Sequence, residues 1–280
     1  MTDKPLIMTL LVRDEEDIIG ENIAFHHAAG VDHFIVTDNL SSDSTPDILA
    51  SFVRRGLVTL LHEPSDTYDQ ARWVTRMARM ACTEFGAGWV INSDADEFWV
   101  AENGDLKAFF RGLPEDVNVV AASRHDFAYC WEEDGRPWHE AMIYRKRRSL
   151  NHIGLPLPPK VAHRAHPEVE VAQGNHEVAG IGPQKVVSEG IMILHFPVRS
   201  RRQFERKIAN GGAAYERNTS VPKTMGRGWR RLYQRLRKEG SLQGYLEEYG
   251  LTREQIREGL RTGELILDTR IADFVAAGRA

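Results

Sequence analysis

Three carboxylates stand within four residues of one another in the segment Asp94-Ala95-Asp96-Glu97. They follow residues 89–92, which predict a strand, so the charges would lie at its carboxyl end. Carboxylates this close repel one another unless a cation or a basic side chain neutralises them. Oxygen ligands in a short acidic turn suit Mg²⁺ or Mn²⁺, which keep waters and take further ligands from substrate phosphates. Solvated acidic loops also contain Asp-x-Asp by chance, but the position after a strand favours a metal site.

The segments before this turn alternate between strand and helix patterns. Residues 6–12 are a continuous apolar run, as in a strand buried on both faces, and Thr45-Pro46 supplies the N-cap and first-turn proline of a helix. The predicted strands are residues 6–12, 34–37, 57–61 and 89–92, and the helices between them end at Gly30, Gly56 and Gly86. This alternation favours an α/β fold with a mostly parallel, Rossmann-like sheet flanked by helices, in which ligands bind beyond the carboxyl ends of the strands.

The pattern loses its regularity in the second half of the chain. A short helix at 106–111 and a strand at 117–123 are expected first. Residues 126–183 are rich in Trp, His, Gly and Pro, which indicates loops and hairpins. Further short strands are expected at 141–145, 169–172 and 191–194, and the chain becomes helical after His195.

The composition excludes little. The 280 residues carry 36 Lys and Arg against 40 Asp and Glu, a formal charge of −4, so the total does not indicate a nucleic-acid-binding protein. Cys82 and Cys130 have no Cys-x-x-Cys spacing and suggest reduced thiols in a cytoplasmic protein, although one disulfide is also consistent with them. The apolar run at 6–12 is too short for a signal-peptide core or a membrane span.

Positive charge is concentrated in residues 199–238, which contain thirteen basic residues and two glutamates, a net +11. Two interpretations stay open. The stretch could be a solvated helical face. Alternatively, it could bind an acidic polymer or hold the protein at the inner face of a membrane, since each basic residue near an anionic leaflet contributes about 1 kcal/mol.

Four motifs in order resemble the glycosyltransferase family 2-like proteins with a GT-A fold. They are Leu11-Val12-Arg13-Asp14-Glu15, then Val36-Thr37-Asp38-Asn39 with Ser42-Asp43-Ser44-Thr45, then residues 89–98, and finally His195-Phe196 followed by Ser200, Phe204 and Lys207. The last is similar to the H-Y, S, F and K pattern of the branch whose acidic turn reads D-A-D-E-F. The motifs cover roughly residues 5–210.

The resemblance implies a GT-A catalytic domain over 1–198, with acceptor-side loops at 126–183, and a basic helical region at 199–280. It also implies an activity. A sugar would pass from a UDP- or GDP-sugar donor to a hydroxyl of a glycan, a lipid-linked or a small-molecule acceptor, with inversion and with Mn²⁺ or Mg²⁺. No nucleic-acid partner is expected.

The same resemblance implies roles for the acidic residues. Asp38 matches the residue that accepts a hydrogen bond from the donor's base. Leu40 stands where the family commonly has a glycine or a small residue, so Asn39 is an alternative one position along the chain. Asp94 matches the residue near the ribose or the metal, and Asp96 matches the direct metal ligand.

Candidates for binding the donor's phosphates are Arg13, Arg72, Lys160, Lys207 and residues 145–148. Arg13 would contact the nucleotide or pair with acidic residues 14–17, because exposed ion pairs are common. Arg72 and Arg76 lie four apart on one predicted helix face, where they could point at a diphosphate or only at solvent.

His195 follows the apolar residues 191–194, so it would sit at a strand end. A lone histidine there is usually an ordinary polar residue. The family pattern favours a metal or diphosphate role instead, and His176 is a weaker candidate of the same kind. His26, His27, His33 and His62 are expected to be structural.

The general base is harder to place, because we find no Glu-Asp pair of the kind that carries it in many inverting members. Direct displacement needs a carboxylate or an imidazole within reach of the acceptor hydroxyl. Asp126 is the first candidate, followed by Glu177 and Glu133, although Asp126 could equally form a structural ion pair, for example with Arg124. Four aromatic residues nearby could stack on an acceptor sugar but are more often core; they are Phe127, Tyr129, Trp131 and Trp138.

Two other classes of protein compete with this interpretation. A sugar nucleotidyltransferase would need a glycine-rich phosphate loop after the first strand, and residues 11–16 contain no glycine. A non-catalytic protein that binds carbohydrate or a polymer would use the aromatic residues or the basic helices. It would need neither nucleotide nor Mn²⁺.

Overall fold

The computed structural model describes residues 4–278 except Tyr68, Glu133, Asp134, His152, Ile153, Ser220, Val221, Lys223 and Met225. Glu133, one of the candidate bases, therefore lies outside the described residues. Within these residues, no helix is long and apolar enough to cross a membrane. Cys82 and Cys130 are both free thiols.

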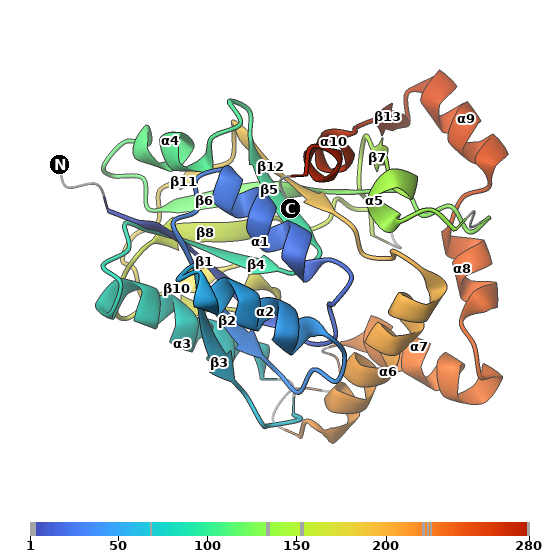
Figure 1. Cartoon of the computed structure of the whole chain (residues 1–280), viewed down its shortest axis with the longest axis horizontal. Helices are drawn as coiled ribbons and strands as arrows, with labels where there is room; N and C mark the ends of the chain where they lie inside the picture. Colours follow the sequence, from blue (N-terminus) through green and yellow to red (C-terminus); the bar gives the residue numbers. More distant parts are fainter. Residues whose placement is uncertain are drawn as a thin grey trace.

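Four parallel strands form the N-terminal part of the central sheet, in the order β3-β2-β1-β4 (Figure 1). They are β1 (Leu6–Val12), β2 (His33–Asp38), β3 (Val58–His62) and β4 (Trp89–Asp94), and the helices between them are α1 (Ile19–Ala28), α2 (Thr45–Arg54) and α3 (Gln70–Thr83). Alternate residues of β1 face opposite layers: Met8 belongs to the core with α1 and α2, and Ile7 to the core with α3. This two-sided burial explains the continuous apolar runs and confirms the predicted α/β architecture.

The sheet continues as β4-β8-β6-β12-β5. The added strands are β5 (Glu97–Ala101), β6 (Val119–Asp126), β8 (Lys160–Arg164) and β12 (Ile191–His195). β8 runs antiparallel to both of its neighbours, and β12 pairs parallel with β6 and antiparallel with β5. Only Ala95 and Asp96 separate β4 from β5, so a tight turn holds the acidic residues at the edge of the sheet.

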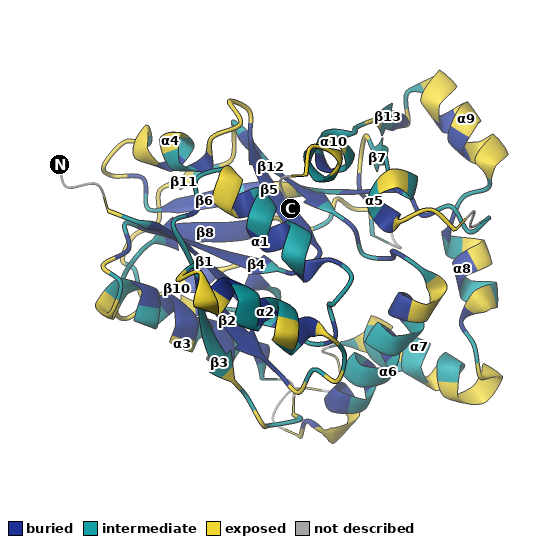
Figure 2. Cartoon of the chain, in the orientation of Figure 1, coloured by how far each residue is buried: buried dark blue, intermediate teal, exposed yellow. Residues whose placement is uncertain are grey.

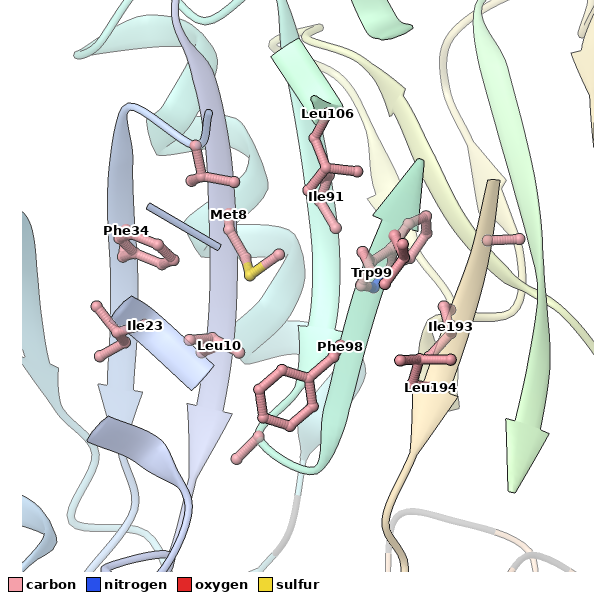
Figure 3. Packing of buried hydrophobic residues seen from close by; sticks show 14 of the residues in the cluster. Met8, Leu10, Ile23, Phe34, Ile91, Phe98, Trp99, Leu106, Ile193 and Leu194 are labelled. Atoms are coloured by element: carbon pink, nitrogen blue, oxygen red, sulfur yellow. The ribbon is translucent and has the colours of Figure 1, made fainter. Parts of the chain in front are cut away.

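One core joins both halves of this sheet. Phe98 and Trp99 of β5 lie in the same cluster as Leu10 of β1 and as Ile193 and Leu194 of β12 (Figure 3). The central strands are almost completely buried (Figure 2). The acidic turn is thus anchored to the main hydrophobic core of the molecule.

Short elements fill the region between β5 and β12. They are α4 (Leu106–Arg111), α5 (Trp138–Ala141), β7 (Tyr144–Lys146), β9 (Glu170–Val171), the 3-10 turn Gln173–Asn175, β10 (Val178–Ala179) and β11 (Val186–Val187). The predicted strand at 141–145 was only partly correct, because its first residue ends α5 and the strand begins at Tyr144. β7 pairs with β13 (Leu265–Leu267), near the end of the chain.

Five helices follow β12 along one side of the molecule (Figure 1). They are α6 (Arg201–Arg217), α7 (Arg227–Glu239), α8 (Gln243–Tyr249), α9 (Arg253–Thr262) and α10 (Arg270–Ala276). α10 returns to the sheet, where Ile271 enters the main core and the ring of Phe274 lies 5.2 Å from that of Phe25. The C-terminal helices are therefore packed onto the N-terminal layers.

The contact between α6 and α7 depends on two glycines of α6. A Cβ added to Gly211 would lie 2.5 Å from the ring of Trp229, and one added to Gly212 would overlap the Cβ of Tyr233. We therefore expect Gly212→Ala to lower the free energy of unfolding in urea by about 1–3 kcal/mol, as overpacking does. The matched control is Gly228→Ala in α7, where the added Cβ meets open space. This control should be neutral or stabilising by up to about 1 kcal/mol; equal effects of the two changes would contradict the packing.

Candidate functional site

A cavity of about 650 Å³ opens at the carboxyl ends of β1 and β4. On the sheet side it is lined by Leu11, Val12, Arg13, Asn39, Asp94, Ala95 and Asp96. These residues lie at the ends of β1, β2 and β4 or in the loops that follow them. The opposite side is formed by α6, α7 and α8, so residues on both sides of position 198 line one cavity.

Asp94 is held by a buried lysine. Lys160 Nζ lies 2.5 Å from Asp94 Oδ2 and 3.0 Å from Glu97 Oε1, and Lys160 is 1% exposed. Burial alone would lower the pKa of Lys160, but the charges of Asp94 and Glu97 outweigh it and raise the pKa. Gln70 and Asn175 donate to the other oxygen of Asp94. The ammonium group of Lys160 thus neutralises the buried carboxylate of Glu97.

Asp96 faces both a histidine and a second lysine. Its Oδ2 lies 2.5 Å from Lys207 Nζ and 3.7 Å from His195 Nε2, and His195 Nδ1 is 2.8 Å from Asp126 Oδ1. Burial would raise the pKa of Asp96, but Lys207 and His195 hold it well below its usual range. Burial would lower the pKa of His195, but the charge of Asp96 and the hydrogen bond with Asp126 raise it to about 9. Asp126, His195 and Asp96 therefore form one continuous chain of contacts into the cavity.

Two members of this chain, Asp96 and His195, carry oxygen and nitrogen donors that a divalent cation can bind. Asp126 at Nδ1 turns the other ring nitrogen of His195 toward Asp96, as in carboxylate–histidine–metal sites. Among the described residues no complete group of three or more His, Cys, Asp or Glu ligands is present. Mg²⁺ and Mn²⁺ commonly need only one or two protein ligands, because waters and substrate phosphates supply the rest. Asp96 and His195 fit such an ion, with Asp94 one residue away from Asp96.

The second motif lies at the end of β2. Asn39 lines the cavity, and its side chain donates to the carbonyl oxygens of Glu63 and Ser65. Asp38 is buried behind this position, and its Oδ1 accepts no hydrogen bond from the described residues. Leu40 has a φ of 60°, a left-handed conformation that favours glycine.

Arg13 lines the cavity and pairs with Asp66 rather than with the acidic residues 14–17. Its guanidinium lies 2.6 Å from Asp66 Oδ1, and Arg217 of α6 lies 2.5 Å from the other oxygen of Asp66. The loop after β3 is therefore tied to both β1 and α6 at the rim of the cavity.

Several predicted site residues lie outside the cavity. Arg72 is exposed on α3, Arg76 faces Glu63 at 3.7 Å, and Glu177 is exposed beyond the 3-10 turn. Asp126 does not pair with Arg124 and reaches the cavity only through His195. Residues 145–148 also do not line it; Arg145, for example, pairs with Asp268.

The aromatic residues after β6 belong mainly to the core. Phe127 stacks on Phe196 with ring centroids 4.2 Å apart, and Trp138 donates its indole N–H to the carbonyl oxygen of Asp17. The structural interpretation of His26 also holds, since its ring accepts from the backbone N–H of Trp99. Burial lowers the pKa of His26 to about 3, so the ring is neutral.

Sequence reasoning missed the cavity's far wall. This wall is lined by Phe204, Ile208, Tyr215, Trp229, Leu232, Tyr245 and Tyr249. The apolar residues of α7 recur at helical spacing and predict an amphipathic helix, but the spacing does not say which element the helix covers.

Several basic residues of the +11 stretch form ion pairs within the chain. Arg199 contacts Glu15 and Asp17, and Arg206 contacts Glu16 and Asp43. Lys207 and Arg217 also contact aspartates, as described above. Arg199 and Arg206 thus form ion pairs with the acidic residues that follow β1. The net charge of the segment alone did not reveal these pairs.

Removal of Lys160 should be strongly destabilising. Glu97 is fully buried, and Arg124, its other basic neighbour, is 3.8 Å away. We expect Lys160→Met to lower the free energy of unfolding by about 3–5 kcal/mol, the usual cost of leaving one partner of a buried ion pair alone. Adding Glu97→Gln should restore part of the loss in urea denaturation. A double variant less stable than Lys160→Met would contradict this pairing.

The chain matches one family model and is similar to several solved structures. Residues 8–151 match the model of glycosyltransferase family 92. No curated protein sequence matches the chain. The solved structure of S. aureus TarS 1–349 in complex with UDP-GlcNAc is similar at 11% identity, over 90% of this chain and 77% of that one, with a TM-score of 0.48. The mannosyltransferase PcManGT from Pyrobaculum calidifontis, in complex with GDP-Man and Mn²⁺, is similar at 14% identity, over 93% and 79%, with a TM-score of 0.43.

Proposed function

The chain belongs to glycosyltransferase family 92, and from this premise we propose that it transfers a sugar from a nucleotide-diphosphate donor to a hydroxyl acceptor. The predicted enzyme class and the GT-A type of α/β fold are confirmed at this level. The finer relationship to the family 2 branch with the D-A-D-E-F turn stays a proposal, supported by the order of the four motifs.

One observation carries the choice of donor. Asp96, His195 and Lys207 meet at the carboxyl ends of β1 and β4, inside a cavity that also contains Lys160 and Arg124. Carboxylate and imidazole ligands beside lysine and arginine side chains suit a metal-bound diphosphate better than a neutral group. The solved structures named above were determined with UDP-GlcNAc and with GDP-Man. UDP and GDP are therefore the first nucleotides to test.

In the proposed mechanism, Asp96 and His195 would hold Mn²⁺ or Mg²⁺, which when bound neutralises charge on the departing diphosphate. The chain's own cations would also neutralise charge on the diphosphate. Lys207 lies on the first turns of α6 and reaches Asp96, so its ammonium is positioned to bind a phosphate oxygen. Asn39, with Asp38 buried behind it, is our candidate for binding the nucleobase of the donor.

Asp126 is assigned to positioning His195 rather than to proton transfer. We expect Asp126→Asn to raise the Mn²⁺ concentration needed for half-maximal activity by about 10- to 100-fold, as loss of such partners does, with activity largely restored at high Mn²⁺. Direct titration of Mn²⁺ binding should show the same weakening. A variant that is inactive at every Mn²⁺ concentration but binds the ion normally would return Asp126 to the role of base.

Nucleotide binding tests the proposal directly. UDP, GDP, CDP and TDP are added with and without Mn²⁺ while the melting temperature is followed. A ligand at one hundred times its dissociation constant stabilises the folded state by about 2.7 kcal/mol. For a protein of this size that corresponds to a shift of roughly 5–10 °C. A shift that requires both nucleotide and Mn²⁺ supports the proposal, and no shift with any nucleotide overturns it.

A further inference from the structure

The cavity wall opposite the acidic turn is built from aromatic rings. Phe204 comes from α6, Trp229 from α7, and Tyr245 and Tyr249 from α8. We refer to these four residues as the aromatic wall. Figure 1 shows that α6, α7 and α8 follow one another beside the sheet. The wall lines the same cavity as Asp96 and His195, so a molecule in this cavity can contact both.

Three rings of the wall are arranged in parallel. The ring centroids of Phe204 and Tyr245 are 5.8 Å apart with an interplanar angle of 9°, and those of Tyr245 and Tyr249 are 5.8 Å apart at 14°. Behind them, Leu242 and Leu246 are buried in a core of their own. Rings stacked on one another over an apolar base form a rigid group, which costs little entropy when a ligand packs against it.

The wall is fixed at both ends of α8. At the start, Glu205 of α6 accepts hydrogen bonds from Ser241 Oγ at 2.8 Å and from the Leu242 N–H at 2.7 Å. At the end, the Leu251 N–H donates to the Tyr129 carbonyl oxygen at 2.8 Å. A Cβ on Gly250 would lie 2.8 Å from the Leu246 carbonyl oxygen and 3.0 Å from Tyr129. The end of α8 therefore packs directly against the segment that follows β6.

This anchor brings the wall close to the proposed reaction centre. Tyr129 lies three residues after Asp126, the last residue of β6, and Asp126 contacts His195. Burial, and then the charge of Asp126, raise the pKa of Tyr249, which is consistent with a short distance between the two. The end of the wall at Tyr249 therefore adjoins the His195 side of the cavity.

The remaining lining is polar. Gln173, His176, Arg124 and Asn210 line the same cavity as the rings. Two cations, Lys146 over Tyr249 at 5.2 Å and Arg235 over Tyr245 at 5.9 Å, hold the rings but do not line the cavity. Aromatic surface beside hydrogen-bonding groups suits a pyranose, which presents C–H groups on its faces and hydroxyls on its edge. An alkyl chain would leave the polar groups without partners.

We infer that the aromatic wall is the acceptor subsite and that the acceptor is a saccharide whose pyranose ring packs on Tyr245 and Tyr249. The inference rests on the proposed function, because a saccharide at the wall is an acceptor only if a nucleotide-sugar occupies the sheet side. It places acceptor recognition on the C-terminal helices, whereas the sequence indicated residues 126–183.

The test uses saturation-transfer NMR on the full chain with UDP or GDP and Mn²⁺ present. The probes are methyl pyranosides and disaccharides of glucose, mannose, galactose and N-acetylglucosamine, together with octyl glucoside. We expect saturation of the pyranose C–H protons. Binding should weaken roughly five- to tenfold in Tyr245→Ala and in Tyr249→Ala, in line with the loss of one aromatic contact. Tyr245→Phe and Tyr249→Phe, which keep the rings, should bind like the unchanged protein.

The outcomes separate this inference from the proposed function. If no nucleotide raises the melting temperature, the proposed function fails. If nucleotide binds but no pyranoside is saturated, if only the octyl protons are saturated, or if the alanine variants bind every probe normally, the acceptor inference is overturned. Melting temperatures are measured for all variants. Should Tyr249→Ala unfold, Tyr245→Ala and Trp229→Ala take its place, since both residues are only half-buried.

Discussion

Asp96→Asn is expected to abolish sugar transfer while the protein stays folded. Asp96 is 3% exposed, and its carboxylate faces both Lys207 and His195 across the proposed cation site. An amide is a weak ligand for Mg²⁺ or Mn²⁺ and carries no charge to balance the two basic groups. Loss of a group that stabilises a developing anion costs about two to three orders of magnitude, and loss of the ion itself costs more. We therefore expect kcat to fall by at least about three orders of magnitude.

The control for Asp96→Asn is Asp116→Asn, an exposed aspartate paired with Lys185 far from the cavity. It should leave transfer unchanged. Melting temperature and circular dichroism establish that the Asp96 variant is folded, and nucleotide binding is followed by the thermal shift. We expect the shift to lose its dependence on Mn²⁺. Normal turnover by a folded Asp96→Asn variant would remove the metal assignment.

The sequence predicts well which residues at the ends of the first strands meet at the cavity, because their positions depend on local pattern. Strands buried on both faces are mostly apolar, so polar residues gather toward the strand ends. Arg13, Asn39 and Asp94 lie where the apolar runs of β1, β2 and β4 give way to polar residues, and parallel pairing brings them to one edge. β8 was missed because its five residues include Lys160, His163 and Arg164, whose burial depends on partners elsewhere in the chain.

The other half of the cavity depends on contacts that no periodicity encodes. Tyr249 reaches the site because α8 docks on Tyr129, and Lys207 reaches it because α6 crosses the ends of the strands. For Asp126, the sequence suggested a place in the cavity that the residue does not have. Its position at the end of β6 suggests a base in the cavity, but the neighbouring β12 places His195 in front of it. Proximity in sequence to the site does not determine which of two adjacent strand ends reaches solvent.

With Asp126 assigned to positioning His195, we propose His176 as the general base. Its Nδ1 lies 2.7 Å from the carbonyl oxygen of Pro159, which fixes Nδ1 as the donor and leaves Nε2 to accept a proton. The ring lines the cavity. A Cβ on the neighbouring Gly174 would lie 2.9 Å from Nε2, so the glycine leaves the ring its space. Of the bases expected from the sequence, Asp126 and Glu177 do not line the cavity, and Glu133 lies outside the described residues.

We therefore expect His176→Gln to lower kcat by about two to four orders of magnitude, the usual contribution of a general base. Nucleotide binding should be unchanged, and His27→Gln, an exposed histidine of α1, should be fully active. Loss of activity together with loss of the nucleotide-dependent thermal shift would instead assign His176 to donor binding.

The pH profile gives an independent test of the same assignment. Burial, together with the nearby Lys160 and Arg124, lowers the pKa of His176 from its ordinary value of 6.5. Because the neutral ring is the active form, kcat should stay constant from neutral pH down to about that value and fall only below it. In His176→Gln the residual rate should lose this acid limb, since no imidazole remains to be protonated. An acid limb that persists unchanged in the variant would show that another group accepts the proton.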